Sequence, residues 1–329
     1  VLGWNRVRGS FERLRFAHAM GPVPTQKALQ DALDRCEHAG TKRAAPPTDI
    51  RNLLKIIRDG KVRMPEVVSR HGTRLLSNHA RSLRPDELWL VHEQVCEALL
   101  DTGDVSRAKD IVLKLDKRFP KSLRVAVLKG QLFECCEDYE SAEEIYAHIL
   151  EEDEAHQRAR KRRVCVAKAQ GKMGRAVELL KEYLDVFMTD AEAWEELASL
   201  YLASHLQQQA IFCYEELILL NPQEPRYHLK LADLMHALGG GQGATGSSGQ
   251  KVALAHYAVV LELTNGCSVH AMYGVLACSN LIKHSSRGQQ GKLSDEEESL
   301  VRKVQQKLKH VYENANPELG KYMQEALIT

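Results

Sequence analysis

The chain has 329 residues, of which 44% are hydrophobic and 27% are charged. Its 45 basic and 44 acidic residues nearly cancel, so the composition indicates no general attraction to nucleic acid or to an anionic membrane surface. The eight cysteines form no Cys-x-x-Cys pair, which argues against a disulfide framework and favours reduced, packed thiols. The longest apolar run, 252–263, is too short to span a bilayer and is interrupted by His256.

The first 47 residues carry little regular pattern. The chain starts at Val1 rather than at Met, so this part is either the start of a fragment or an added extension. Residues 24–40 favour one helix ended by Gly40, and 41–47 (TKRAAPP) is typical of a linker. We therefore expect residues 1–47 to be a poorly ordered N-terminal extension.

Residues 48–82 are expected to form two capping helices. Thr48 suits a helix N-cap, aliphatic residues follow at helical spacing, and Gly60 ends the helix. Pro65 fits the first turn of a second helix that runs through about Ser82.

Residues 89–222 repeat one helical hairpin. In 191–222 (AEAWEELASLYLASHLQQQAIFCYEELILLNP), apolar and small residues recur three and four apart on two helices, and Pro222 ends the second. The small residue at the closest approach of these helices is Ala210, and steps of 34 residues toward the N-terminus reach Ala176, Ala142 and Ala108. This period resembles the tetratricopeptide repeat. The sequence therefore predicts an all-α fold, a tetratricopeptide-repeat superhelix (an α-solenoid of antiparallel helix pairs) over 48–329.

The end of the array is less regular. A fifth repeat, 223–266, places Ala253 at the alanine position, but nine extra residues precede it in the glycine-rich stretch 239–250, which we expect to be a flexible loop. That stretch spells Gly-x-Gly-x-x-Gly, but the helices expected on both sides argue against a dinucleotide site. Residues 267–329 are expected to form a degenerate C-terminal cap, in which Ser294 and Glu297 make a capping box.

In such an array the first helix of each pair lines an inner groove. The residues left over for this groove after the packing positions are removed are Arg158, Lys161, Arg162, Lys168, Arg124, Gln131, Glu192 and Glu195. The run 158–163 (RARKRR) is the densest charge cluster in the chain. It either binds an acidic partner segment or is neutralised by the acidic run 151–154 (EEDE) that precedes it.

No pattern indicates catalysis. The fourteen histidines show no metal-ligand spacing, and no nucleophile–base pair or carboxylate dyad stands out. His92, His148 and His228 are expected on helix surfaces, and one of the adjacent Cys135 and Cys136 in the core. The sequence predicts a protein-binding chain without catalytic residues, metal or cofactor, rather than an enzyme.

The first repeat (DELWLVHEQVCEALLDTGDVSRAKDIVLKLDKRFPKSLRV), the basic QRARKRRVCVAKAQGK and the segment AWEELASLYLASHLQQQAIFCYEELILLNP resemble, in order and spacing, the family of subunit 2 of the endoplasmic reticulum membrane protein complex. The similarity covers about 48–285. The resemblance implies a non-catalytic scaffold on the cytoplasmic face of the endoplasmic reticulum membrane. It also implies that the chain is peripheral, is held by the other subunits of the complex, and helps to insert tail-anchored and multipass proteins.

The alternative is a co-chaperone whose groove binds the C-terminal carboxylate of a chaperone. Glu93 and Glu97 lie at groove positions of the first repeat, where they would repel a carboxylate, so the sequence disfavours this reading.

Overall fold

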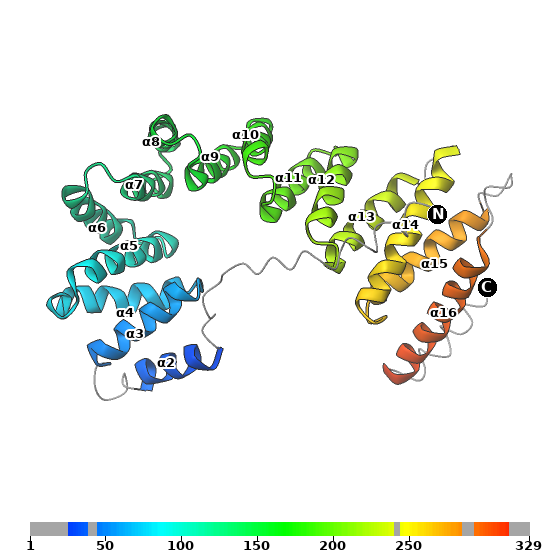
Figure 1. Cartoon of the computed structure of the whole chain (residues 1–329), viewed down its shortest axis with the longest axis horizontal. Helices are drawn as coiled ribbons and strands as arrows, with labels where there is room; N and C mark the ends of the chain where they lie inside the picture. Colours follow the sequence, from blue (N-terminus) through cyan, green and yellow to red (C-terminus); the bar gives the residue numbers. More distant parts are fainter. Residues whose placement is uncertain (1–25, 39–44, 240–243, 285–292, 316–329) are drawn as a thin grey trace, which may run out of the picture. The chain divides into compact units, whose positions relative to one another are not determined.

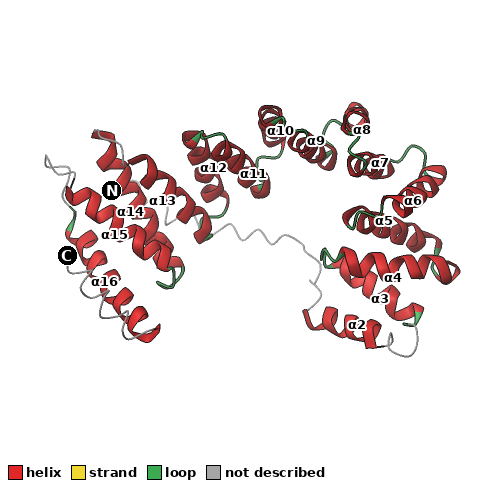
Figure 2. Cartoon of the chain, turned by 180° about the vertical axis from the view of Figure 1, so that it is seen from behind, coloured by secondary structure: helices red, strands yellow, loops and turns green. Residues whose placement is uncertain are grey.

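The computed structural model describes residues 26–38, 45–239, 244–284 and 293–315, and every regular element in these ranges is a helix (Figure 1, Figure 2). The chain divides into two compact units, Val1–Val166 and Ala167–Thr329. The border falls within α9. The predicted all-α repeat fold is confirmed for the part of the chain that the structure describes.

The first unit consists of consecutive packed helices. They are α2 (Gln26–His38), α3 (Pro47–Asp59), α4 (Pro65–Asn78), the short 3₁₀ helix η3 (Ala80–Ser82), α5 (Pro85–Asp101), α6 (Val105–Arg118), α7 (Leu123–Cys135), α8 (Tyr139–Glu152) and most of α9 (Gln157–Ala169). The second unit continues with α10 (Met173–Val186), α11 (Ala191–Ala203), α12 (Gln207–Leu220), α13 (Pro225–Gly239), α14 (Ala244–Leu263), α15 (Val269–His284) and α16 (Asp295–Ala315).

The 34-residue period governs the helix boundaries. The second helices of four hairpins begin at Val105, Tyr139, Met173 and Gln207, each 34 residues after the last. The alanine three residues further on is fully buried in all four, at Ala108, Ala142, Ala176 and Ala210, with 0% exposure. The predicted alanine register is confirmed, and Ala253 of the fifth hairpin is equally buried. A larger side chain here would separate the paired helices.

The turn inside each of these hairpins has the same geometry. Gly103, Glu137, Gly171 and His205 are 34 residues apart and all have positive φ, between 58° and 77°. In each turn the next residue donates its N–H to a carbonyl five residues back, as from Asp104 to Leu99 at 2.9 Å. These are Schellman C-caps, in which the left-handed residue is usually glycine. Two of the four repeats form this turn with Glu137 or His205 in place of glycine.

Helix α2 corrects the prediction for the N-terminal region. Ala32 and Cys36 are only 2% exposed and belong to the same apolar core as Leu53 and Leu54 of α3. Residues 26–38 thus form the helix predicted within 24–40. This helix is packed rather than part of a loose extension, because two small residues one turn apart bring α2 against α3. Residues 1–25 and 39–44 lie outside the described residues.

The glycine-rich stretch is also different from the prediction. Helix α14 already begins at Ala244, so 244–250 is helical and not a loop. Gln250 is 2% exposed, and its Nε2 donates to the carbonyl of His236 on α13 at 2.9 Å. This contact ties the early turns of α14 to α13 and overrides the low helix propensity of glycine. Residues 240–243 lie outside the described part.

The C-terminal helices follow the pattern expected of them. The N–H of Ser294 donates to Glu297 at 2.8 Å, and the N–H of Glu297 donates to the Ser294 hydroxyl at 3.2 Å, which is the predicted capping box. Val301, Val304 and Leu308 of α16 are buried against α15.

Three side-chain expectations are wrong. His92 and His228 are buried, 9% and 6% exposed, because their ring nitrogens bond the carbonyls of Leu88 and Pro222. Cys135 and Cys136 are both exposed, since α7 ends there. His148 lies on the surface as expected, with a side chain that is 71% exposed.

Candidate protein-binding site

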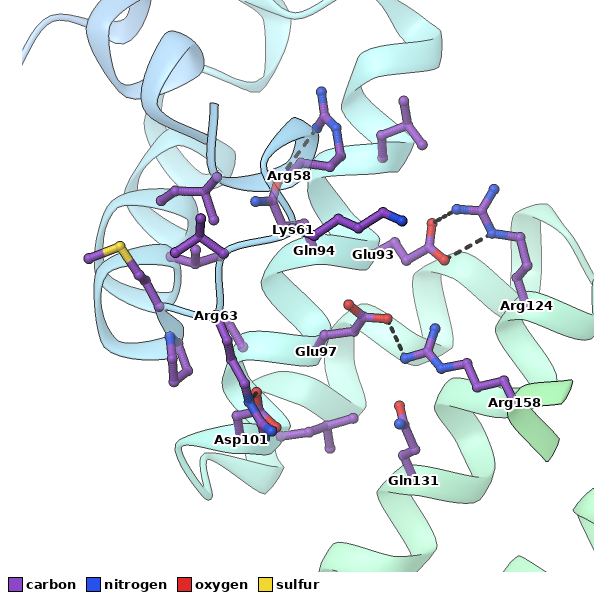
Figure 3. A pocket seen from close by; sticks show the side chains of 18 of the residues that line it. Arg58, Lys61, Arg63, Glu93, Gln94, Glu97, Asp101, Arg124, Gln131 and Arg158 are labelled. Carbon is purple, nitrogen blue, oxygen red and sulfur yellow. Dashed lines mark hydrogen bonds and ion pairs between the residues drawn. The ribbon is translucent and has the colours of Figure 1, made fainter. Parts of the chain in front are cut away.

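A charged hollow of about 560 Å³ opens in the first unit between the end of α3 and helices α5, α7 and α9 (Figure 3). Its cationic lining residues are Arg58, Lys61, Arg63, Arg124, Arg158 and Arg162. Its carboxylates are Glu93, Glu97 and Asp101, which are spaced by four and therefore share one face of α5.

Each carboxylate of α5 holds an arginine from a different element. Glu93 Oε1 accepts from Arg124 Nε of α7 at 3.0 Å, and Glu97 Oε1 accepts from Arg158 Nη2 of α9 at 2.5 Å. Asp101 accepts two bonds, at 2.8 and 3.1 Å, from Arg63 in the loop after α3. The face of α5 thus links three elements into one charged wall, as the dashed lines of Figure 3 show for these pairs.

Arg162 belongs to a more buried network at the back of this wall. Its Nε donates to Glu134 at 2.9 Å, and the hydroxyl of the fully buried Tyr146 donates to the same carboxylate at 2.5 Å. Burial, followed by the charge of Glu134, raises the pKa of Tyr146. Burial, the largest single effect, would lower the pKa of Arg162, but the hydrogen bond to Glu134 and the charges around it together outweigh burial and raise that pKa. Arg162 therefore stays charged and fixed in place.

The family is decided by comparison with known proteins. Residues 110–241 match the family described as the EMC2 TPR-like repeat domain. The ER membrane protein complex subunit 2 of Xenopus tropicalis is 36% identical over 231 residues, which cover 70% of this chain and 75% of the relative. The chain belongs to the ER membrane protein complex subunit 2 family. The TPR repeat protein oca3 of Schizosaccharomyces pombe is also similar, at 33% identity over 227 residues, 69% of this chain and 76% of that protein.

Among solved structures, the PilF protein of Pseudomonas aeruginosa aligns with a TM-score of 0.42 and 19% identity, over 73% of this chain and 98% of that one. Within the described ranges, none of the helices of this family member combines the length and the apolar character needed to cross a membrane.

Four of the eight groove residues predicted from the sequence meet in the hollow: Arg124, Gln131, Arg158 and Arg162. The other four do not line it. Lys161 is half-buried on α9, and Lys168 pairs with Glu196 of α11 at 2.6 Å in the second unit. Glu192 is exposed and Glu195 half-buried on α11, also in the second unit.

The basic run of α9 is neutralised, but largely by other acids than those expected. Glu154 of the acidic run 151–154 lies 3.9 Å from Arg160. Arg158 and Arg162 instead use Glu97 and Glu134, and Arg163 Nε donates to Glu143 of α8 at 2.7 Å. Carboxylates from neighbouring helices therefore hold three of these arginines, which keeps α9 attached to the helices before it.

Sequence reasoning missed the contribution of α3. Arg58 and Lys61 reach the hollow from the end of this helix, which the sequence assigned to a cap with no binding role. The signal available in the sequence was the pair Gly60–Lys61, a glycine followed by a cation where the helix ends. In the structure Lys61 takes a positive φ of 50°. That turn directs the lysine out of the helix and over the hollow (Figure 3).

Three buried cysteines have thiols of low reactivity. Burial raises the pKa of the Cys96, Cys213 and Cys278 thiols to about 12, so these thiols stay protonated and are weak nucleophiles. Within the described residues, no group of three or more His, Cys, Asp and Glu side chains is arranged to hold a metal ion.

Proposed function

We propose that this chain is a non-catalytic scaffold subunit of the ER membrane protein complex, held at the cytoplasmic face of the membrane by its partner subunits. The observation that carries the proposal is the 36% identity over 231 residues with a relative of that name. The repeated hairpins support it, because stacked helix pairs present extended surfaces on which other chains can bind.

In this role the chain organises membrane-embedded partner subunits while they insert tail-anchored and multipass proteins. The hollow of the first unit is the candidate docking site for a partner segment, with Arg124, Gln131 and Arg158 at its wall. Arg162, bonded to Glu134, supports that wall from behind. Outside the hollow, Lys161 is a further candidate docking residue of the first unit. In the second unit, taken by itself, the candidate docking residues are Lys168, Glu192 and Glu195.

Affinity purification of the tagged chain from detergent-solubilised endoplasmic reticulum membranes tests the role. We expect integral membrane subunits of the complex to be recovered with it. Recovery of soluble chaperones without membrane subunits would instead support the co-chaperone alternative and contradict the proposal.

A charge swap separates docking from structural support at Arg158. Its side chain is 45% exposed and that of Glu97 is 39% exposed, so this pair adds only about 0–1 kcal/mol to stability. Arg158→Glu brings two carboxylates together, whereas Arg158→Glu combined with Glu97→Arg restores an internal ion pair. If Arg158 binds the partner, both variants lose co-purifying subunits. If its role is only to hold Glu97, the double variant recovers them, and the docking assignment is wrong.

A further inference from the structure

The cations of the hollow outnumber the carboxylates that can neutralise them. Arg63, Arg124, Arg158 and Arg162 are each paired with a carboxylate. Among the described residues, Arg58 donates to the neutral Gln94, at 3.4 Å between Nη1 and Oε1, and pairs with no carboxylate. Lys61 has no carboxylate partner among the described residues and is exposed. Two positive charges are therefore left over at the mouth of the hollow, on the end of α3.

A second hollow, of about 350 Å³, adjoins the first and is mostly apolar, with Asp86, Glu93, Ser122 and Arg124 as its polar lining residues. Trp89 of α5 and Phe119 after α6 line it as one packed aromatic pair, with ring centroids 5.5 Å apart in an edge-to-face arrangement. The buried Leu115 and Leu128 line it as well. Leu90 lines both hollows, as do Glu93 and Arg124, so the two form one continuous surface.

Apolar side chains at this junction are partly open to solvent. Leu90 and Phe119 are each 37% exposed, and so is Val62 at the rim of the charged hollow. Large apolar groups beside unneutralised charge are typical of the centre and rim of a protein-binding surface.

We propose that the joined hollows bind an acidic peptide segment that carries one bulky apolar side chain. The apolar side chain enters the second hollow beside the packed Trp89 and Phe119 rings, and carboxylates of the same segment face Arg58 and Lys61. This rests on the proposed function in that the segment belongs to a partner subunit, but it specifies the chemistry of that segment.

The sign of the charge decides the occupant. A basic segment would meet Arg58 and Lys61, while Glu93, Glu97 and Asp101 already bind arginines. Among the described lining residues, this leaves only the carboxylate of Asp86 to attract a basic segment, against two cations. An acidic segment neutralises both leftover cations without breaking an existing ion pair. The aromatic hollow then supplies most of the affinity, while the charges select the partner and speed its arrival.

The test uses the purified full-length chain and fluorescence anisotropy. The probe is a short fluorescein-labelled peptide of glutamates and serines around one central leucine. One matched peptide replaces the leucine by serine, and another replaces the glutamates by lysines. We expect the first to bind at least about tenfold more tightly than either of the others, with an affinity that falls as salt rises.

Variants locate the site. Lys61→Glu together with Arg58→Gln, and separately Leu90→Asp, should each weaken binding of the acidic leucine peptide by about tenfold or more. Phe119→Asp should do the same, and Leu90→Asp keeps the test informative if Phe119→Asp disturbs folding. Matched controls are Lys109→Glu and Leu113→Asp on the exposed side of α6, outside both hollows, which should leave binding unchanged.

Equal binding of the serine or lysine peptide overturns the proposal, as does unchanged binding by the Lys61 and Leu90 variants. If these peptides fail while the tagged chain still recovers membrane subunits, this inference is wrong and the scaffold role stands. If the peptides bind as expected and no membrane subunit is recovered, the scaffold role is wrong and the site stands.

Discussion

Gly130→Ala tests the packing that holds the charged wall in place. Gly130 lies on α7 where the ring of Tyr146 from α8 packs directly on the helix backbone. A methyl group built at position 130 would lie 2.5 Å from Cζ and 2.8 Å from the hydroxyl oxygen of Tyr146. Because Tyr146 is fully buried, its ring can move only by displacing its neighbours.

Two costs oppose one gain. Overpacking a filled site costs about 1–3 kcal/mol, and a displaced Tyr146 also weakens its bond to the charged Glu134, worth about 1.5–3 kcal/mol. Alanine in a helix interior regains about 1 kcal/mol over glycine. The costs win, so we expect a net loss of about 2–3 kcal/mol in the free energy of unfolding.

Urea unfolding followed by circular dichroism measures the loss as a lower midpoint at unchanged slope. Gly174→Ala is the matched control, because position 174 is also helical and has nothing within 4 Å of the added methyl group. That variant should gain up to about 1 kcal/mol. If Gly130→Ala unfolds at or above the wild-type midpoint, the packing argument is refuted.

A compensating change provides a second check. The next repeat has Val164 and Leu180 at the positions that correspond to Gly130 and Tyr146, so a larger first residue goes with a smaller second one. Tyr146→Leu in the Gly130→Ala background should therefore restore the packing, and the double variant should lose less stability than the two single changes predict together.

Three further predictions concern helix caps and a buried histidine. Glu137→Gly and His205→Gly should each raise the free energy of unfolding by about 1 kcal/mol, because both residues have positive φ in a C-cap. Urea unfolding measures this gain, and a loss of stability at either position would show that the backbone there is not strained. Leu206→Asp should raise the free energy of unfolding by about 1 kcal/mol, because Leu206 is the N-cap of α12 and makes no side-chain hydrogen bond there. An unchanged urea midpoint would show that the aspartate does not cap the helix. Burial, and then His228, lower the pKa of His256 to about 4, so the unfolded chain takes up the proton first as pH falls below about 6.5. Roughly 2–3 kcal/mol of stability should therefore disappear between pH 6.5 and 4, and His256→Leu should flatten that slope in unfolding measured against pH.

The fold was predictable from the sequence where one residue type decides the packing. The buried alanines at 34-residue spacing, such as Ala142 and Ala176, fix where each second helix meets its partner. Composition failed where tertiary contacts override local preference. Glu137 adopts a positive φ in a turn where glycine is the usual residue. The glycine-rich residues 244–250 are helical because Gln250 donates a hydrogen bond to α13. A local sequence pattern does not show which distant segments will touch, so it does not reveal such contacts.

The candidate site was predictable only in part, for an electrostatic reason. The repeat pattern placed Arg124 and Arg158 at groove positions of two different helices. The net charge of the groove, however, depends on their ion-pair partners, which are 31 and 61 residues away in the sequence. Glu93 and Glu97, which the sequence suggested would repel an acidic ligand, are themselves neutralised by these two arginines. The repulsion and the attraction expected of the groove thus cancel each other, and the charge that remains for a ligand lies on Arg58 and Lys61. In the binding mode proposed above, a segment assigned to a cap therefore helps to select the partner of the first unit, because its two cations are the ones that face the ligand.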